Sequence, residues 1–127
     1  MSATCEWRQH EGVRYLFLCP GGRGAEHLAD VLRGAHELMV PEPPGLLRAL
    51  FDNRPLSGFL PGSAQLGEAK RVQRDVLREH SLRLAVVGVT GVSAAVVRGM
   101  SAMSGRVTML PAPTPESALA FLAREVS

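Results

Sequence analysis

The sequence has little of what marks several large classes of protein. Its 127 residues include only two cysteines, and aromatic residues make up 5% of the chain. The 14 basic and 12 acidic side chains leave a formal net charge of +2, too small to indicate nucleic acid as an obligatory partner. The longest uncharged stretch, residues 84–97, is shorter than the ~20 residues that a membrane-spanning helix needs. We therefore expect no disulfide framework, no nucleic-acid partner and no transmembrane segment.

The N-terminus and the cysteine usage both indicate the cytoplasm. Residues 1–8 (MSATCEWR) contain no basic segment followed by an apolar one, as a secretory signal would. Neither cysteine belongs to a C-x-x-C pair or lies near paired histidines, which fits a reducing compartment. With 46% hydrophobic and 20% charged residues, the chain has enough apolar material for one core. We expect a single cytoplasmic domain over residues 1–127.

The N-terminal pattern predicts a β-hairpin that keeps the two cysteines apart. Strand-like runs at residues 4–8 and 13–19 flank Gly12, and this spacing places Cys5 opposite Leu16. Cys19 is then about three residues out of register with Cys5, which exceeds the Cα separation that a disulfide tolerates. We expect two buried free thiols.

Hydrophobic periodicity predicts that strands and helices alternate along the rest of the chain. Continuous apolar runs predict buried strands, and apolar residues spaced three and four apart predict amphipathic helices. After the hairpin we expect, in order, a helix at 25–39, a strand at 46–52, a helix at 66–77, a strand at 82–89, a helix at 93–103, a strand at 106–110 and a helix whose N-cap is Thr114.

This alternation predicts an α/β fold. Strands joined by helices imply right-handed crossovers and a mixed, mostly parallel sheet of five strands, covered on its faces by about four helices. The opening hairpin adds an antiparallel edge. We expect the core to include Leu16, Leu18, Val31, Val86, Val87 and Leu119.

Two glycine-bearing turns come after predicted strands and before predicted helices, where phosphate groups often bind. Residues 22–27 (GRGAEH) resemble a dinucleotide fingerprint, but His27 occupies the position of its third glycine. Residues 88–93 (GVTGVS) place hydroxyls at a helix N-terminus but lack the lysine of a Walker loop. We interpret both as structural turns, with anion binding at the second as the alternative.

No pattern in the sequence predicts a catalytic or metal site. The histidines are not spaced to share a helix face with one another or with a cysteine, so we expect surface histidines and no zinc site; they are residues 10, 27, 36 and 80. A nucleophile elbow is absent, because Arg54 and Pro55 stand where a glycine should precede Ser57. We expect a protein that is not an enzyme and uses no cofactor.

The helix at 66–77 has a basic outer side that resembles a membrane-surface helix. Four cations line this side, namely Lys70, Arg71, Arg74 and Arg78. Three nearby acids largely balance their charge, and two of them are spaced for i,i+3 pairs, Glu68 with Arg71 and Asp75 with Arg78. We interpret this side as a solvated surface.

The clearest candidate contact surface is an apolar loop with the helix at 93–103. Residues 54–62 set apolar side chains among proline, glycine and serine, where nothing local buries them. The helix at 93–103 is less polar on its outer side than a solvent-facing helix should be. We predict that ligand or partner contacts fall on Asp52, Ser57, Phe59, Leu60, Val97 and Met100.

Several segments resemble the SpoIIAA-like branch of the STAS superfamily. The segments are LAVVGVTG at 84–91, VVRGM at 96–100, MSGR at 103–106 and SALAFL at 117–122, with earlier strands at 12–18 and 47–52. Phe121 stands where tryptophan is usual in that family. The D-S-[ST]-G phosphorylation motif of anti-sigma-factor antagonists is absent, which puts a kinase-controlled switch in doubt.

This resemblance implies a non-catalytic binding module whose fold is also similar to the lipid-binding SEC14 domain. It implies a lipid or other apolar or amphiphilic ligand, or a peripheral membrane surface, bound between the helices at 63–79 and 93–103. The alternative is an interaction switch of the anti-sigma-factor-antagonist type, with a protein partner at the 52–60 loop. An enzyme that uses a nucleotide at the glycine turns is a third hypothesis. We further predict that Phe59 and Leu60 either lie close to the helix at 93–103 or complete the contact of a homodimer.

Overall fold

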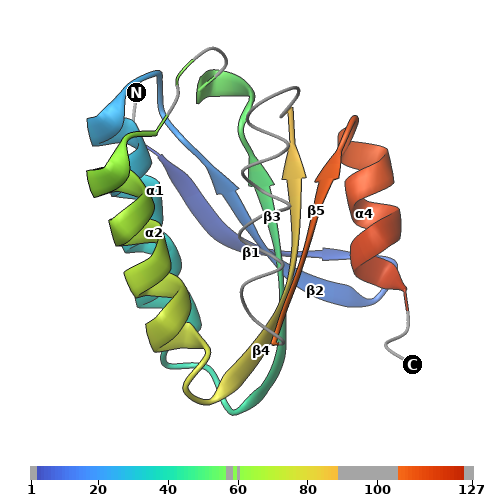
Figure 1. Ribbon diagram of the computed structural model, residues 1–127. Coiled ribbons are helices and arrows are strands. Elements are labelled where there is room, and N and C mark those ends of the chain that lie inside the picture. The colour runs from blue at the N-terminus through green and yellow to red at the C-terminus, as the bar shows by residue number, and fades with distance from the viewer. Residues whose placement is uncertain (1–2, 57–58, 60, 89–105, 125–127) are drawn as a thin grey trace.

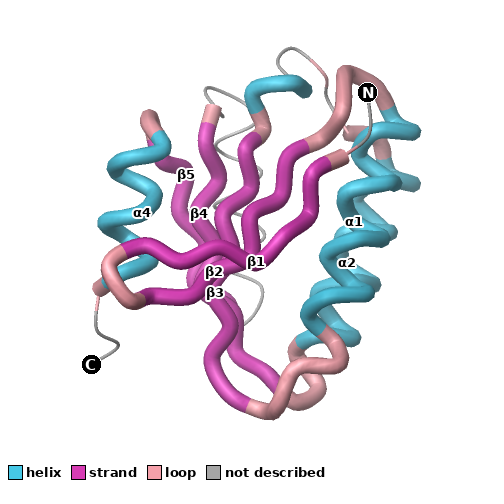
Figure 2. The backbone as a smooth tube through the Cα atoms, turned by 180° about the vertical axis from the view of Figure 1, so that it is seen from behind, coloured by secondary structure: helices cyan, strands magenta, loops and turns pink. Residues whose placement is uncertain are grey.

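The computed structural model describes residues 3–56, 59, 61–88 and 106–124. In this part of the chain a five-stranded sheet lies between two helical layers, with α1 and α2 on one face and α4 on the other (Figures 1 and 2). The elements are β1 (Thr4–His10), β2 (Val13–Cys19), α1 (Ala25–Met39), β3 (Gly45–Asp52), a 3₁₀ turn η1 (Arg54–Leu56), α2 (Ser63–Val76), β4 (His80–Val87), β5 (Val107–Ala112) and α4 (Pro115–Ala123).

The sheet confirms the predicted fold class. Its strand order is β1-β2-β3-β4-β5, with β1 antiparallel to β2 and every later pair parallel. The bounds of α1 coincide with the predicted ones, and Thr114 caps α4 by accepting a hydrogen bond from the backbone N–H of Ser117 at 3.1 Å. The described residues contain three α-helices. The fourth predicted helix, at 93–103, lies outside them.

The hairpin register differs from the prediction. Glu11 and Gly12 both have positive φ, 50° and 80°, and form a two-residue turn that matches the twist of the strands. Because β1 extends to His10, Cys5 pairs with Leu18 rather than Leu16. Cys19 pairs with Thr4, so the two thiols point to opposite faces of the sheet. Both cysteines are free, as expected, but half-buried rather than buried.

Each face of the sheet carries its own hydrophobic core. The larger core packs under α1 and α2, and its most buried members include Leu16, Val31, Ala49 and Val76. The smaller core packs under α4 and includes Tyr15, Leu50, Val87 and Leu122. The predicted core is confirmed at Leu16, Leu18, Val31, Val86 and Val87, while Leu119 is partly buried against the α4 core.

Two arginines on the central strands hold the C-terminal end of α4. Arg48 on β3 and Arg83 on β4 are register partners, and their Nε atoms donate to the carbonyl oxygens of Leu122 and Phe121, each at 2.9 Å. The Arg83 guanidinium also lies over the ring of Phe121, 4.3 Å from its centroid. The last carbonyls of a helix are its negative end, which attracts both cations and offsets their mutual repulsion.

His80 contradicts the expectation of surface histidines, because it is only 3% exposed. Its Nδ1 lies 2.8 Å from the carbonyl oxygen of Val76, and its Nε2 lies 2.8 Å from that of Glu42. The ring therefore joins the end of α2 to the loop between α1 and β3. This contact depends on chain segments 38 residues apart, so local spacing gives no sign of it.

Candidate functional site

The carboxyl ends of the parallel strands lie at the same end of the sheet as the N-terminal ends of α1 and α2 (Figure 1). α/β proteins generally bind ligands at this carboxyl end of the strands, because the strand-to-helix loops lie there. Of the six residues predicted to make contacts, Asp52 and Phe59 belong to the described part of the chain. Ser57, Leu60, Val97 and Met100 lie outside it.

Asp52, at the end of β3, is a buried carboxylate held by Arg54. It accepts hydrogen bonds from the Arg54 backbone N–H at 3.1 Å, from Nε at 2.9 Å and from Nη2 at 2.7 Å. Gly88 has positive φ, and a Cβ placed there would lie 2.6 Å from the Cγ of Arg54. A side chain at position 88 would therefore collide with the arginine that holds Asp52.

Arg54 keeps Asp52 ionised. Burial raises the pKa of Asp52, but the hydrogen bonds from Arg54, together with its charge, outweigh burial, so the pKa lies below its usual range. A carboxylate with a lowered pKa and three hydrogen bonds is a poor general base. Asp52 therefore has a structural role: its hydrogen bonds with Arg54 order the start of the loop after β3.

The loop that follows is partly folded down onto the core. Leu56 is 3% exposed, and Phe59 is half-buried against the core under α1 and α2. The backbone N–H of Phe59 donates to the carbonyl oxygen of Leu56 at 2.8 Å. Both side chains thus help to close the core next to the N-terminal end of α2.

A groove lies between the first turns of α1 and α2. Its volume is about 320 Å³. Apolar side chains make most of its lining, and polar ones lie at its rim; the apolar residues are Ala25, Leu28, Ala29, Leu32 and Ala64, and the polar ones are Glu26, Gln65 and Glu68. The sequence did not single out this groove, because the two helical stripes that form it are separated by β3 and are joined only when the helices pack side by side.

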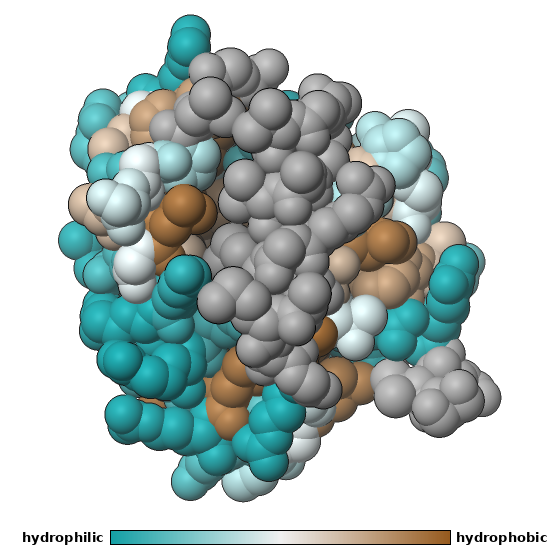
Figure 3. Space-filling model, viewed as in Figure 1, coloured by the Kyte–Doolittle hydropathy of each residue, from teal (hydrophilic) through white to brown (hydrophobic). Residues whose placement is uncertain are grey.

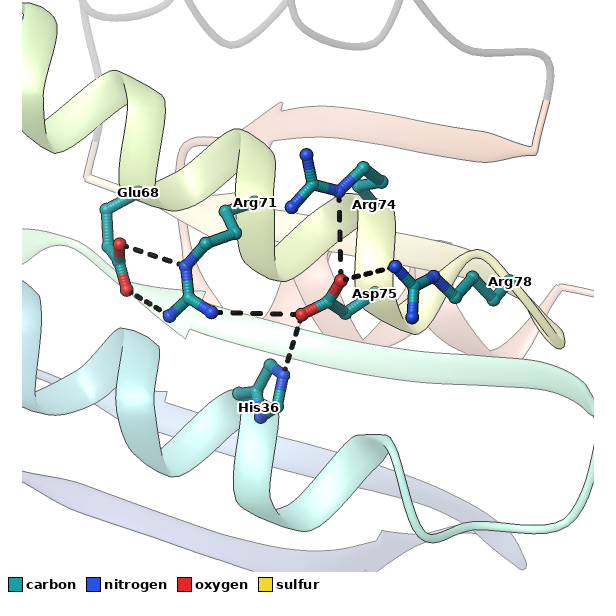
Figure 4. Close-up of polar contacts among 6 residues, drawn as sticks. All are labelled: His36, Glu68, Arg71, Arg74, Asp75 and Arg78. Carbon is teal, nitrogen blue, oxygen red and sulfur yellow. Dashed lines mark hydrogen bonds and ion pairs between the residues drawn. The ribbon is translucent and has the colours of Figure 1, made fainter.

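The other end of the helix pair is charged. Asp75 on α2 lies 3.0 Å from the Nε2 of His36 on α1, and Arg74 and Arg78 approach its other oxygen to 3.7 and 3.6 Å (Figure 4). Arg71 bonds Glu68 at 2.7 Å and lies 3.8 Å from Asp75. The predicted i,i+3 pairs are therefore confirmed. Figure 3 shows hydrophilic residues gathered over the C-terminal half of α2.

The described residues contain no group of three or more histidine, cysteine or acidic side chains that could hold a metal ion. Burial, followed by the charge of Asp52, raises the pKa of the Cys19 thiol. Burial, followed by the charge of Glu37, raises that of Cys5. Both thiols are therefore protonated and weakly nucleophilic at neutral pH.

No described helix is both long and apolar enough to cross a membrane. Neither a family model nor a curated protein matches the chain. A crystal structure of an uncharacterized protein of the DUF3478 family, with a SpoIIAA-like fold, from Shewanella loihica PV-4 is similar, with a TM-score of 0.68 over 96% of this chain and 94% of that one. Sequence identity to it is 16%. The SpoIIAA-like fold that the sequence resemblance implied is thereby confirmed for this chain.

Proposed function

We propose that the protein is a non-catalytic binding module that takes an apolar or amphiphilic ligand into the groove between α1 and α2. The observation that carries this proposal is the groove itself, with its apolar lining at the ligand-binding edge of the fold. Its volume of about 320 Å³ falls at the lower end of the range for small-molecule sites.

The rim of the groove favours an amphiphile over a wholly apolar molecule. Glu26 offers carboxylate oxygens beside an alkyl-sized space, whereas the Oε1 of Gln65 already accepts from the backbone N–H of Gly62 and Glu68 is engaged by Arg71. A ligand with an apolar body and a neutral or cationic head that donates hydrogen bonds suits these groups. An anionic head would face the carboxylate of Glu26 and is disfavoured by charge.

The state of the titratable groups near this edge supports a non-catalytic role. Asp52 is ionised and fully engaged by Arg54, and Cys19 is a protonated thiol. Nucleophilic catalysis needs a nucleophile within hydrogen-bond reach of a base, and these two groups provide neither. The state of these groups is consistent with binding rather than catalysis.

Two alanines in the groove allow a direct test. Ala29 and Ala64 are both exposed in its lining, so phenylalanine at either position fills the space without disturbing the core. Ala120, exposed on α4 in the opposite layer, gives the matched control. The probe is N-phenyl-1-naphthylamine, a neutral apolar dye that fluoresces when it leaves water, and native mass spectrometry of fresh protein detects any ligand that is carried through purification.

We expect the dye to bind the wild type and Ala120→Phe equally, and to bind Ala29→Phe and Ala64→Phe at least tenfold more weakly. A retained mass should disappear in the same two variants. Equal dye binding by all four proteins would overturn the groove as the site. Absence of both dye binding and a retained mass would overturn the ligand-binding function and favour the interaction switch.

A further inference from the structure

Within the described part of the chain, β1 leaves one edge of the sheet open. It is the terminal strand of the sheet and pairs only with β2 among the described residues. Its seven residues pair with β2 without a bulge, and none of them is proline. β5, at the opposite edge, contains Pro111, which has no N–H to offer a further strand. β1 is therefore the better template for another strand.

The hairpin turn determines which backbone groups of β1 face the open edge. In a hairpin with a two-residue turn, the residues that flank the turn bond each other, and every second pair does the same. His10 and Val13 flank the turn, so His10, Arg8 and alternate residues bond to β2. The N–H and C=O groups of Cys5, Trp7 and Gln9 consequently point away from β2.

The side chains of β1 are complementary to themselves in one antiparallel register. Glu6 and Arg8 project from the same face of the strand, where the Nε of Arg8 donates to the Oε2 of Glu6 at 3.1 Å, and their side chains are 54% and 40% exposed. When two β1 strands pair about Trp7, Glu6 of each copy lies opposite Arg8 of the other. A slip of two residues in one direction sets Glu6 against Glu6, and a slip in the other sets Arg8 against Arg8. Charge therefore selects the Trp7-centred register.

We propose that β1 is a self-association surface, through which two copies of this chain pair antiparallel about Trp7 and continue one sheet across both molecules. The contact is isologous, as expected for a dimer with twofold symmetry. It forms about six backbone hydrogen bonds, two at Trp7 and two at each pairing of Cys5 with Gln9. This proposal does not depend on the ligand groove, which lies between the two helices.

Charge reversal tests the register. Glu6→Arg places an arginine opposite Arg8 of the other copy, and Arg8→Glu places a glutamate opposite Glu6 of the other copy. The double variant restores opposite charges at both positions. Sedimentation velocity over a concentration series measures the dimer dissociation constant, and circular dichroism melts confirm that each variant is folded. Glu116→Arg, a reversal at an exposed residue of α4, is the control.

We expect each single reversal to raise the dissociation constant about tenfold and the double variant to return near the wild-type value, since two attractive pairs become repulsive and then attractive again. Glu116→Arg should leave it unchanged. Gln9→Pro provides a second test, because it removes an N–H that faces only the open edge and should abolish the dimer. A monomeric wild type, or a dimer insensitive to all these changes at β1, would overturn the proposal.

Discussion

Asp75 on α2 and His36 on α1 join the two helices that cover one face of the sheet, with 3.0 Å between Oδ2 and Nε2. The hydrogen bond from His36, followed by the charges of Arg78 and Arg74, holds the pKa of Asp75 below its usual range against the opposing effect of burial. Asp75 thus connects α1 to α2 at the charged end of the pair (Figure 4), while the apolar groove lies at the other end.

Asp75→Asn should destabilise the protein at neutral pH and make it less sensitive to acid. A carboxylate whose pKa is lower in the folded state contributes stability above its unfolded pKa of about 3.9, and this contribution is lost as pH falls through the folded value. The difference in urea midpoint between the wild type and Asp75→Asn should therefore be present at pH 7 and shrink as the solution is acidified below pH 4.

Asp30→Asn is the matched control, because Asp30 is exposed on α1 and pairs with Arg33 of the same helix. It should change the midpoint little at either pH. A wild type and an Asp75→Asn variant with the same midpoint at pH 7 would show that the His36 contact does not connect the helices in solution.

Local patterns were sufficient to predict the described helices and strands but not the contacts between them. The three-and-four spacing of Leu28, Val31 and Ala35 marks the buried side of α1, and the structure buries these residues. The hairpin register was wrong because Glu11, a non-glycine residue, adopts positive φ and takes part in the turn. α2 begins at Ser63, three residues before the predicted start, with Gly62 as the N-cap whose N–H donates to the side chain of Gln65.

The candidate site was predictable only in part. Asp52 and Phe59 were singled out from composition, but the carboxylate turned out to be committed to Arg54. The groove combines Ala29 of α1 with Ala64 of α2, and alanine carries no sequence signal for binding. Such a site depends on how two helices that are separated in sequence by β3 pack side by side, which periodicity within each helix does not specify.

Asp52→Asn should lower the free energy of unfolding by about 1 kcal/mol at pH 7, the low end of the cost of breaking a buried polar contact. The low end applies because the Arg54 side chain is 59% exposed, and water can replace the hydrogen bonds that it loses. Because the folded pKa of Asp52 is lowered, the wild type should lose this advantage as pH falls below about 4. Urea unfolding at pH 7 and at acidic pH measures both effects. A variant that is as stable as the wild type at pH 7 would contradict the structural role of this ion pair.

His80→Phe should destabilise the protein although phenylalanine fits the size and burial of the site. It removes both ring contacts to the carbonyl oxygens of Val76 and Glu42 and leaves at least one of these oxygens without its N–H donor, at a cost of about 1–3 kcal/mol. His10→Phe, at the end of the exposed hairpin, should cost little by comparison. Chemical unfolding of the three proteins checks this prediction, and equal stability of wild type and His80→Phe would show that the bridge contributes nothing.

Cys5 and Cys19 should react slowly with thiol reagents and should not form a disulfide with each other. Burial raises the pKa of both thiols, so the reactive thiolate is scarce at neutral pH. Their side chains leave opposite faces of the hairpin, because Cys5 pairs with Leu18 and Cys19 with Thr4. We expect the folded protein to react with 5,5′-dithiobis(2-nitrobenzoic acid) more slowly than free cysteine at pH 7.5, and the rate to rise when urea unfolds the chain. Mass spectrometry after mild oxidation should still find two alkylatable thiols in each folded chain. A cysteine that reacts fast in the folded state would be a nucleophile and would contradict the non-catalytic role. An intramolecular disulfide would contradict the hairpin register.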